Sequence, residues 1–200
     1  MRGRGRQQTD SEIEGASRLG SKDLVVVSAY RPNKATKYTG SVWQQHRIYW
    51  TEREEETDPR EKFTADLKEL VSGWRAEGCE VIVGIDVNGD VPKLAVGSFR
   101  QHMQEVGLHE AILASHHGPY PATQNRNLTD TPIDGIFVSS GVSVKASGYL
   151  EFHQYFQSDH RGLWIDIDLK ATLGGYRQSE YTISVVTSAR HVMSQISRLT

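Results

Sequence analysis

The run "LVVV" at residues 24–27 is the feature of this 200-residue chain that most limits its fold. Four consecutive apolar residues, three of them β-branched, are typical of a strand buried on both faces. A second run of the same character, "CEVIVGIDV", follows at residues 79–87. Both strands therefore require further structure packed against each face of the sheet that holds them.

A helix is predicted between these two strands. Asp58 and, three positions on, Glu61 form a capping box, and apolar residues then recur at helical spacing until Gly78 stops the helix. A shorter helix is predicted from about Ser98 to Val106. The first half of the chain is therefore strand, helix, strand, helix.

The second half changes in character. Residues 115–131 are rich in Gly, Pro, Asn and Asp, which predicts a loop with a hairpin tip. Three strand patterns follow, "IDGIFVSS", "VSVKASGYLEF" and "GLWIDIDL", and then a weak strand "YTISVV" and a short helix around residues 191–196. This order of elements predicts a layered α/β protein whose sheet is at least partly antiparallel.

Composition excludes several classes of protein. The net charge of −2 argues against a globally basic nucleic-acid coat, so a polyanionic partner must be bound locally. The single cysteine, Cys79, excludes an intramolecular disulfide, and no apolar run is long enough to span a bilayer. The basic start "MRGRGRQQTD" lacks the apolar segment of a secretory signal. We expect an intracellular protein, nuclear or cytoplasmic, with no membrane association.

Polar side chains gather at four predicted strand ends, in "SAYRPN", "GIDVNGD", "TPIDGIF" and "SDHRGL". In α/β proteins such edges are where binding and chemistry are usually found. The last motif places Ser158, Asp159 and His160 side by side. Adjacent residues seldom point at one another, so they are not expected to form a hydrolytic triad among themselves. They are expected to join a site whose other members lie elsewhere.

The four motifs, in this order, resemble the endonuclease/exonuclease/phosphatase superfamily, and most closely the endonuclease domains of LINE-type retrotransposons. The resemblance implies a DNase I-like α/β sandwich, with mixed sheets flanked by helices. On this basis residues 1–22 are a flexible polar lead-in, residues 23–170 are the family domain and residues 171–200 are a weakly defined extension.

The resemblance also implies roles for the residues at the first two strand ends. Tyr30 and Asn33 would line a phosphate site, Asp86 would orient or deprotonate the attacking water, and Asn88 would hold that water or the scissile phosphate. Judged from the residues alone, Tyr30 could equally be a packed aromatic at a strand end. Asn88 could equally be part of a turn.

Roles for the last two motifs follow from the same resemblance. Asp134 would accept the imidazole N–H of His160, and His160 would contact the phosphate and stabilise charge in the transition state. Asp159 would ligate Mg²⁺ or Mn²⁺. Ser158 is expected to be a capping or positioning hydroxyl rather than a nucleophile.

The expected partner is DNA, recognised through its phosphate backbone. In the LINE-type relatives the hairpin that corresponds to residues 115–131 lies against DNA, so Arg126 and Asn127 are candidate contacts, although a plain surface turn is equally consistent with the residues. Arg47 is a further candidate for a phosphate contact. The oligomeric state is left open.

The chain departs from the family pattern at its start. Relatives begin with a strand carrying an Asn and a strand carrying the principal metal-binding Glu, and residues 1–22 are too few and too polar to supply them. We therefore expect the domain to be incomplete at its N-terminus. The expected function is a metal-dependent phosphodiester hydrolase, specifically a retroelement-type DNA endonuclease. Two alternatives stay open: a phosphatase of a small phosphoester such as a phosphoinositide, and a degenerate nucleic-acid-binding fragment without turnover.

Overall fold

The structure is a computed structural model, and it describes residues 22–35, 40–126, 130–155, 157–174, 182–187 and 196–199. Asn127 and nearly all of the expected lead-in lie outside these ranges, as do residues 191–195 of the expected C-terminal helix.

A five-stranded sheet forms the centre of the molecule, with strand order β3-β4-β2-β1-β8. β1 and β2 are parallel and every other neighbouring pair is antiparallel, so the sheet is mixed, as expected from the order of elements. The strands of this sheet are β1 (Leu24–Tyr30), β2 (Glu80–Asp86), β3 (Leu108–Glu110), β4 (Asp134–Ser139) and β8 (Ile196–Leu199).

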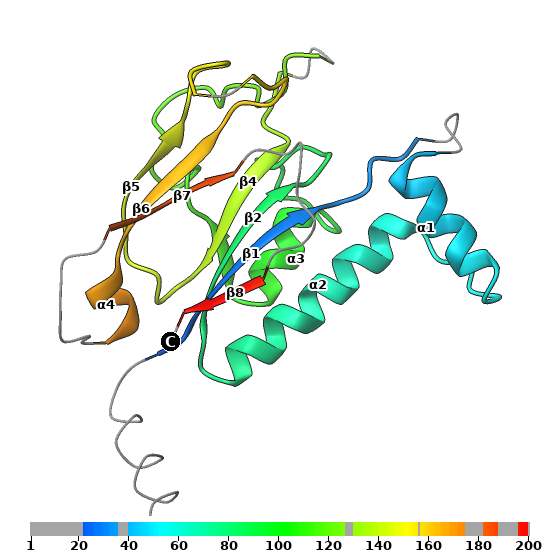
Figure 1. Ribbon diagram of the computed structural model, residues 1–200, viewed down its shortest axis with the longest axis horizontal. Helices are drawn as coiled ribbons and strands as arrows, with labels where there is room; N and C mark the ends of the chain where they lie inside the picture. The colour runs from blue at the N-terminus through cyan, green and yellow to red at the C-terminus, as the bar shows by residue number, and fades with distance from the viewer. Residues whose placement is uncertain are drawn as a thin grey trace, which may run out of the picture.

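A second, three-stranded antiparallel sheet packs on one face of the first (Figure 1). Its apolar residues from β6, such as Leu163 and Ile165, share one core with Leu24, Ile82 and Ile136 of the larger sheet. The strand order of the smaller sheet is β5-β6-β7, with β5 Val144–Tyr149, β6 Leu163–Asp168 and β7 Thr182–Thr187.

Helices cover the other face of the five-stranded sheet. Leu67 and Val71 of α2 pack with Val25 and Val83, and Asp58 caps the helix by accepting a hydrogen bond from the Arg60 amide (2.7 Å). Within the described residues, no helix is both long and apolar enough to cross a bilayer. Of the helices, α2 (Pro59–Ala76) and α3 (Phe99–Glu105) pack on this face, α1 (Val42–Thr51) contacts α2, and α4 (Leu169–Leu173) packs against the core that the two sheets share.

The predicted α/β sandwich is therefore confirmed, with three differences in its elements. The sequence patterns did not predict β3 or α4, because elements of three and five residues are too short to show a period. The helix expected around residues 191–196 is wrong at its end, since Ile196 begins β8. β8 pairs with the outer edge of β1, and the hydrogen bonds of that ladder outweigh a weak helical pattern.

The buried carboxylate of Glu80 connects several segments at the end of the sheet where β2 begins. Glu80 is 2% exposed, and its oxygens contact Lys22 Nζ (2.8 Å), Arg75 Nη1 (2.7 Å) and Ser139 Oγ (2.6 Å). Gly141 lies so close to this carboxylate that a Cβ there would overlap it. The turn after β4 therefore requires glycine for space.

We expect Gly141→Ala to lower the free energy of unfolding by about 1–3 kcal/mol, because it forces the Glu80 carboxylate away from its partners. Gly73→Ala is the matched control. A Cβ on Gly73 meets no atom within 4 Å, and Gly73 lies in α2, so alanine should raise stability by about 0.5–1 kcal/mol. Urea denaturation measures both, and equal effects of the two substitutions would contradict the account.

Candidate functional site

Three neighbouring strands carry polar side chains at the same level of the sheet. Tyr30 at the end of β1 is paired in register with Asp86 at the end of β2, and Asp86 is paired with Asp134 at the start of β4. Residues two apart in a strand share a face. Asp86 therefore lies on the face of Ile82, and Asp134 on the face of Ile136, which is the face that packs against the smaller sheet. The two carboxylates lie where the two sheets meet.

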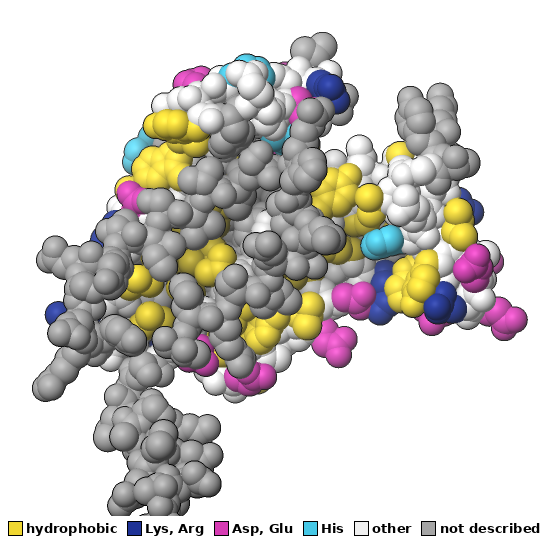
Figure 2. All heavy atoms as spheres, in the orientation of Figure 1, with side chains coloured by type: hydrophobic (Ala, Val, Ile, Leu, Met, Phe, Trp, Pro, Cys, Tyr) yellow, Lys and Arg dark blue, Asp and Glu magenta, His cyan; other side chains and the backbone are white. Residues whose placement is uncertain are grey.

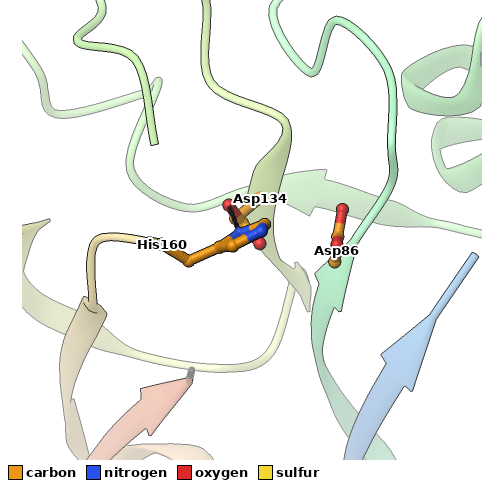
Figure 3. Close-up of side chains that lie close together, drawn as sticks. All are labelled: Asp86, Asp134 and His160. Atoms are coloured by element: carbon orange, nitrogen blue, oxygen red, sulfur yellow. Dashed lines mark hydrogen bonds and ion pairs between the residues drawn. The ribbon is translucent and has the colours of Figure 1, made fainter. Parts of the chain in front are cut away.

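His160 joins them from the loop that precedes β6 (Figure 3). Its Nδ1 is 2.9 Å from Asp134 Oδ2, and because a carboxylate can only accept there, the imidazole donates. One ligand atom from each of Asp86, Asp134 and His160 lies within 4.8 Å of the others. All three side chains are buried, at 5%, 5% and 7% exposure. The structure thus brings together the carboxylate and imidazole that the motifs suggested would pair.

The loop around His160 is held by one local hydrogen bond and by two hydrogen bonds to the loop that precedes β4. Ser158 Oγ accepts from the His160 amide (3.0 Å) and is 5% exposed, which matches a positioning hydroxyl. The carbonyl of Thr123 accepts from the Arg161 amide (2.7 Å), and the carbonyl of Asp159 accepts from the Asn125 amide (3.0 Å). These bonds fix the backbone on both sides of His160.

Thr123 connects that loop to β4. Its hydroxyl oxygen accepts from the amides of Ile133 (2.9 Å) and Asp134 (3.1 Å), and the residue is fully buried. One side chain therefore sets the backbone at Asp134, while the carbonyl of the same residue sets the backbone after His160.

Asn88 ties the ends of β1 and β2 to each other. Its Nδ2 donates to the Arg31 carbonyl (2.8 Å), and its amide donates to Asp86 Oδ1 (2.8 Å). The residue has φ 49°, a left-handed conformation that asparagine tolerates better than most residues. Arg60 holds the same turn from α2 by donating from Nη2 to the Asn88 carbonyl (2.9 Å).

The electrostatics of the cluster favour protons on it. Burial, and then the adjacent charge of Asp134, raise the pKa of Asp86 to about 7. Burial on its own would lower the pKa of His160, but the hydrogen bond that its ring donates to Asp134 and the negative charge of Asp134 outweigh this and raise that pKa above its ordinary value. The folded cluster therefore binds protons more strongly than the same residues do in the unfolded chain.

The remaining residues suggested by the motifs lie in different places. Tyr30 is exposed at the end of β1, and Asn33 is exposed in the segment that follows it. Asp159 Oδ2 is 3.4 Å from Arg126 Nε, so the expected metal ligand and the expected DNA contact face each other. Arg47 lies on α1 with its guanidinium 5.4 Å from the Trp43 ring centroid.

The surface of α1 and the turn after it combines apolar and charged side chains. Ile48 and Tyr49 are about half exposed, at 51% and 46%, and the Arg53 guanidinium lies 3.5 Å from the Tyr49 ring centroid. Figure 2 shows apolar, basic and acidic side chains mixed over this end of the molecule. On the face that Figure 2 shows, this end of the molecule therefore has no continuous basic path for a nucleic acid backbone.

Two residues at the site were not identified from the sequence. Thr123 and Gln124 lie in the loop before β4, and Gln124 Nε2 is 3.1 Å from His160 Nε2. Their contacts join two loops that are far apart in the chain, and loop sequences carry no periodicity that would reveal such pairing. No sequence signal in one chain alone distinguishes them from neighbouring loop residues.

Comparison with known proteins leaves the family open. No protein-family model matches the chain, and no curated protein matches it. Among solved structures, the chain is similar to a crystal structure described as ANGEL2, a 2′,3′-cyclic phosphatase, in complex with adenosine-2′,3′-vanadate, at 11% identity and a TM-score of 0.41. The match covers 83% of this chain but only 41% of that one. Similarity at this level does not establish a shared family or activity.

We expect Thr123→Val to lower the free energy of unfolding by about 1–3 kcal/mol, because two buried amides lose their acceptor. Thr123→Ser keeps the hydroxyl and should lose much less. Urea denaturation of both variants separates the hydroxyl from the methyl group. Equal losses in the two variants would show that packing, not hydrogen bonding, is what Thr123 contributes.

The contribution of Asp86 to the free energy of unfolding should fall as pH rises from about 4 to about 7, because Asp86 ionises near 3.8 when unfolded and near 7 when folded. The contribution of this shift is on the order of 2–4 kcal/mol. Asp86→Asn should remove that fall and be more stable than the wild type at pH 8. In Asp86→Asn, the free energy of unfolding should still fall as pH rises through the raised pKa of His160.

Urea denaturation at several pH values measures this effect. Asp90→Asn, at an exposed position in the same turn, is the matched control and should leave the profile unchanged. Parallel stability profiles for the wild type and Asp86→Asn would show that Asp86 ionises at its ordinary pKa.

Proposed function

We propose that this chain is a metal-dependent phosphoester hydrolase of the endonuclease/exonuclease/phosphatase superfamily, and that its substrate is a DNA phosphodiester. One observation carries the proposal: the hydrogen bond between Asp134 and His160, with the Asp86 carboxylate beside it at one edge of the sheet. These three residues come from three of the four strand-end motifs that resemble the family.

The cluster supplies groups that hydrolysis of a phosphoester needs. A phosphodiester is anionic and repels nucleophiles, so its hydrolysis needs a base for water and fixed donors for the phosphate oxygens. A carboxyl group whose pKa is about 7, as for Asp86, is matched to accepting a proton at neutral pH. His160, oriented by Asp134, is a donor that can carry positive charge.

The same carboxylates fit a divalent cation. Oδ1 of Asp86 and Oδ2 of Asp134 accept the hydrogen bonds described above, which leaves one further oxygen on each carboxylate for a ligand. Mg²⁺ and Mn²⁺ prefer such oxygen donors, and Mg²⁺ keeps several waters, so two or three protein ligands suffice. Asp86 and Asp134 would hold the ion, with Asp159 as a third candidate, and an Asp86 carboxylate bound to the ion would orient the attacking water rather than take its proton. A bound ion would polarise a phosphoryl oxygen and offset the repulsion between the two carboxylates.

DNA is favoured as the substrate by the position of Arg126. Its side chain is 66% exposed, and its Nε lies 3.4 Å from Asp159, directly next to His160 in sequence. Arg126 is therefore a candidate contact for a phosphate backbone near this loop, because a guanidinium binds phosphate strongly. Arg47, Asn127 and the pair Tyr30 and Asn33 stay candidate contacts from the sequence. A small phosphoester would use the same centre without Arg126.

We expect the chain to nick supercoiled plasmid DNA only weakly in the presence of Mg²⁺, because the sequence supplies no counterpart of the family's principal metal-binding Glu, and we expect EDTA to abolish the nicking. His160→Ala and Asp134→Asn should each lower the rate by about 10²–10⁴-fold, because the charged donor is lost or misoriented. Asp134→Asn should also leave thermal stability nearly unchanged. Gel electrophoresis measures nicking, and His46→Ala, at an exposed position in α1, is the matched control with an unchanged rate.

Two further arms decide between substrates. Arg126→Ala should weaken nicking of DNA and leave hydrolysis of a small substrate, p-nitrophenyl phosphate or an inositol phosphate, unaffected. Hydrolysis of the small substrate alone would replace the DNA endonuclease by a phosphatase. Nicking that persists at the wild-type rate in His160→Ala would remove this site from the reaction.

A further inference from the structure

The side chain of Gln124 lies against the outer nitrogen of His160. Gln124 Nε2 is 3.1 Å from His160 Nε2, while His160 Nδ1 is bonded to Asp134 on the opposite side of the ring. Both nitrogens of the imidazole are therefore engaged by protein groups. A phosphate oxygen that bound to Nε2 would occupy the place of the Gln124 amide.

This contact is set by the backbone. Gln124 and His160 form an isolated antiparallel β-bridge, and the hydrogen bonds from Arg161 to Thr123 and from Asn125 to Asp159 flank it. Residues directly opposite each other in such a bridge have neighbouring side chains. Thr123 in turn is anchored to β4 through its hydroxyl. The Gln124 side chain is therefore held beside the imidazole by its rigid surroundings.

An amide is suited to hold an imidazole without binding it too strongly. Its N–H can donate to a neutral Nε2, and after rotation its carbonyl can accept from a protonated Nε2. The amide is uncharged, so in either orientation it makes a weaker bond than an anion would. Hydrogen bonds between an imidazolium and a phosphate oxygen are charge-assisted and roughly twice as strong as neutral ones. A phosphate can therefore displace the amide.

We propose that Gln124 is a displaceable positioning residue: it holds the Nε2 side of His160 when no substrate is bound and gives way to an oxygen of the substrate phosphate. The inference rests on the proposed function in taking His160 as the contact for a phosphate group. It adds to that site a residue that sets the affinity for phosphate. The contact between Gln124 and His160 must break before phosphate binds, so it lowers the affinity. The same contact keeps His160 in its binding orientation until then.

Substitutions of Gln124 should therefore strengthen phosphate binding. Gln124→Met keeps the length of the side chain without the amide, and the affinity for inorganic phosphate should rise about 3- to 10-fold, as expected from the loss of one neutral hydrogen bond. Gln124→Ala should act in the same direction. Gln124→Glu should weaken phosphate binding by about tenfold or more, because a carboxylate would pair with the imidazolium and repel the anion. Gln45→Ala, in α1, is the matched control and should have no effect.

The experiment is ¹⁵N NMR of the His160 ring in the full chain during titration with inorganic phosphate, with thermal unfolding to verify that each variant is folded. Without phosphate, Gln124→Met should shift the Nε2 resonance and leave Nδ1, which is bonded to Asp134, nearly unchanged. With phosphate, the wild-type Nε2 resonance should move and the Nδ1 resonance should not.

The results separate this inference from the proposed function. An Nε2 resonance that is the same in Gln124→Met and the wild type would overturn the inference. So would phosphate affinity that is unchanged or weaker in Gln124→Met, even if the wild type nicks DNA. Tighter phosphate binding by the Gln124→Met and Gln124→Ala variants, with no hydrolysis by any protein, would support the inference and remove the proposed function.

Discussion

Two carboxylates, Asp86 and Asp134, lie opposite each other in neighbouring strands at a position from which water is largely excluded. Burying one charge is unfavourable, and burying two of the same sign side by side is more so. The surrounding residues respond to this constraint: the Asn88 amide donates to one carboxylate and the His160 ring to the other, and Arg60 lies near enough to lower the pKa of Asp86. A stable fold would not retain such a pair for its own sake, since apolar residues would serve better. The arrangement is understandable as one that a proton or a cation completes.

The rigidity of the site comes mainly from backbone contacts. Thr123 binds two amides at the start of β4, and its carbonyl binds the amide that follows His160. The loop before β4 and the loop before β6 are therefore held to each other by bonds that do not involve the side chains of Asp86, Asp134 or His160. Side chains carried on such a frame keep their geometry with little loss of entropy when a ligand arrives. This explains how a site can be built largely from loops and strand ends, with Arg60 of α2 supporting the turn that follows Asp86.

The parts of the site that the sequence predicted are those attached to regular strands. Asp86 ends a run of β-branched residues and Asp134 begins another, so their placement followed from the strands that carry them. His160 could be placed because the strand pattern from Leu163 starts soon after it. Gln124 could not, because its place depends on a bridge between two loops that are far apart in the chain, and no local pattern encodes that bridge. The error at the end of the helix expected around residues 191–196 has a related cause: Ile196 pairs with Val27, which is far away in the chain, and this pairing overrides the local preference.

The pairing of β8 with β1 has a consequence for how the protein is made. β1 leaves the ribosome long before β8, so the outer edge of β1 stays without this neighbour until Ile196–Leu199 has been made. An apolar strand with a bare edge can pair with the same strand of another nascent chain. The Leu24–Tyr30 segment is therefore where chaperone binding during translation would matter most, and slower synthesis of the second half would lengthen the period of risk.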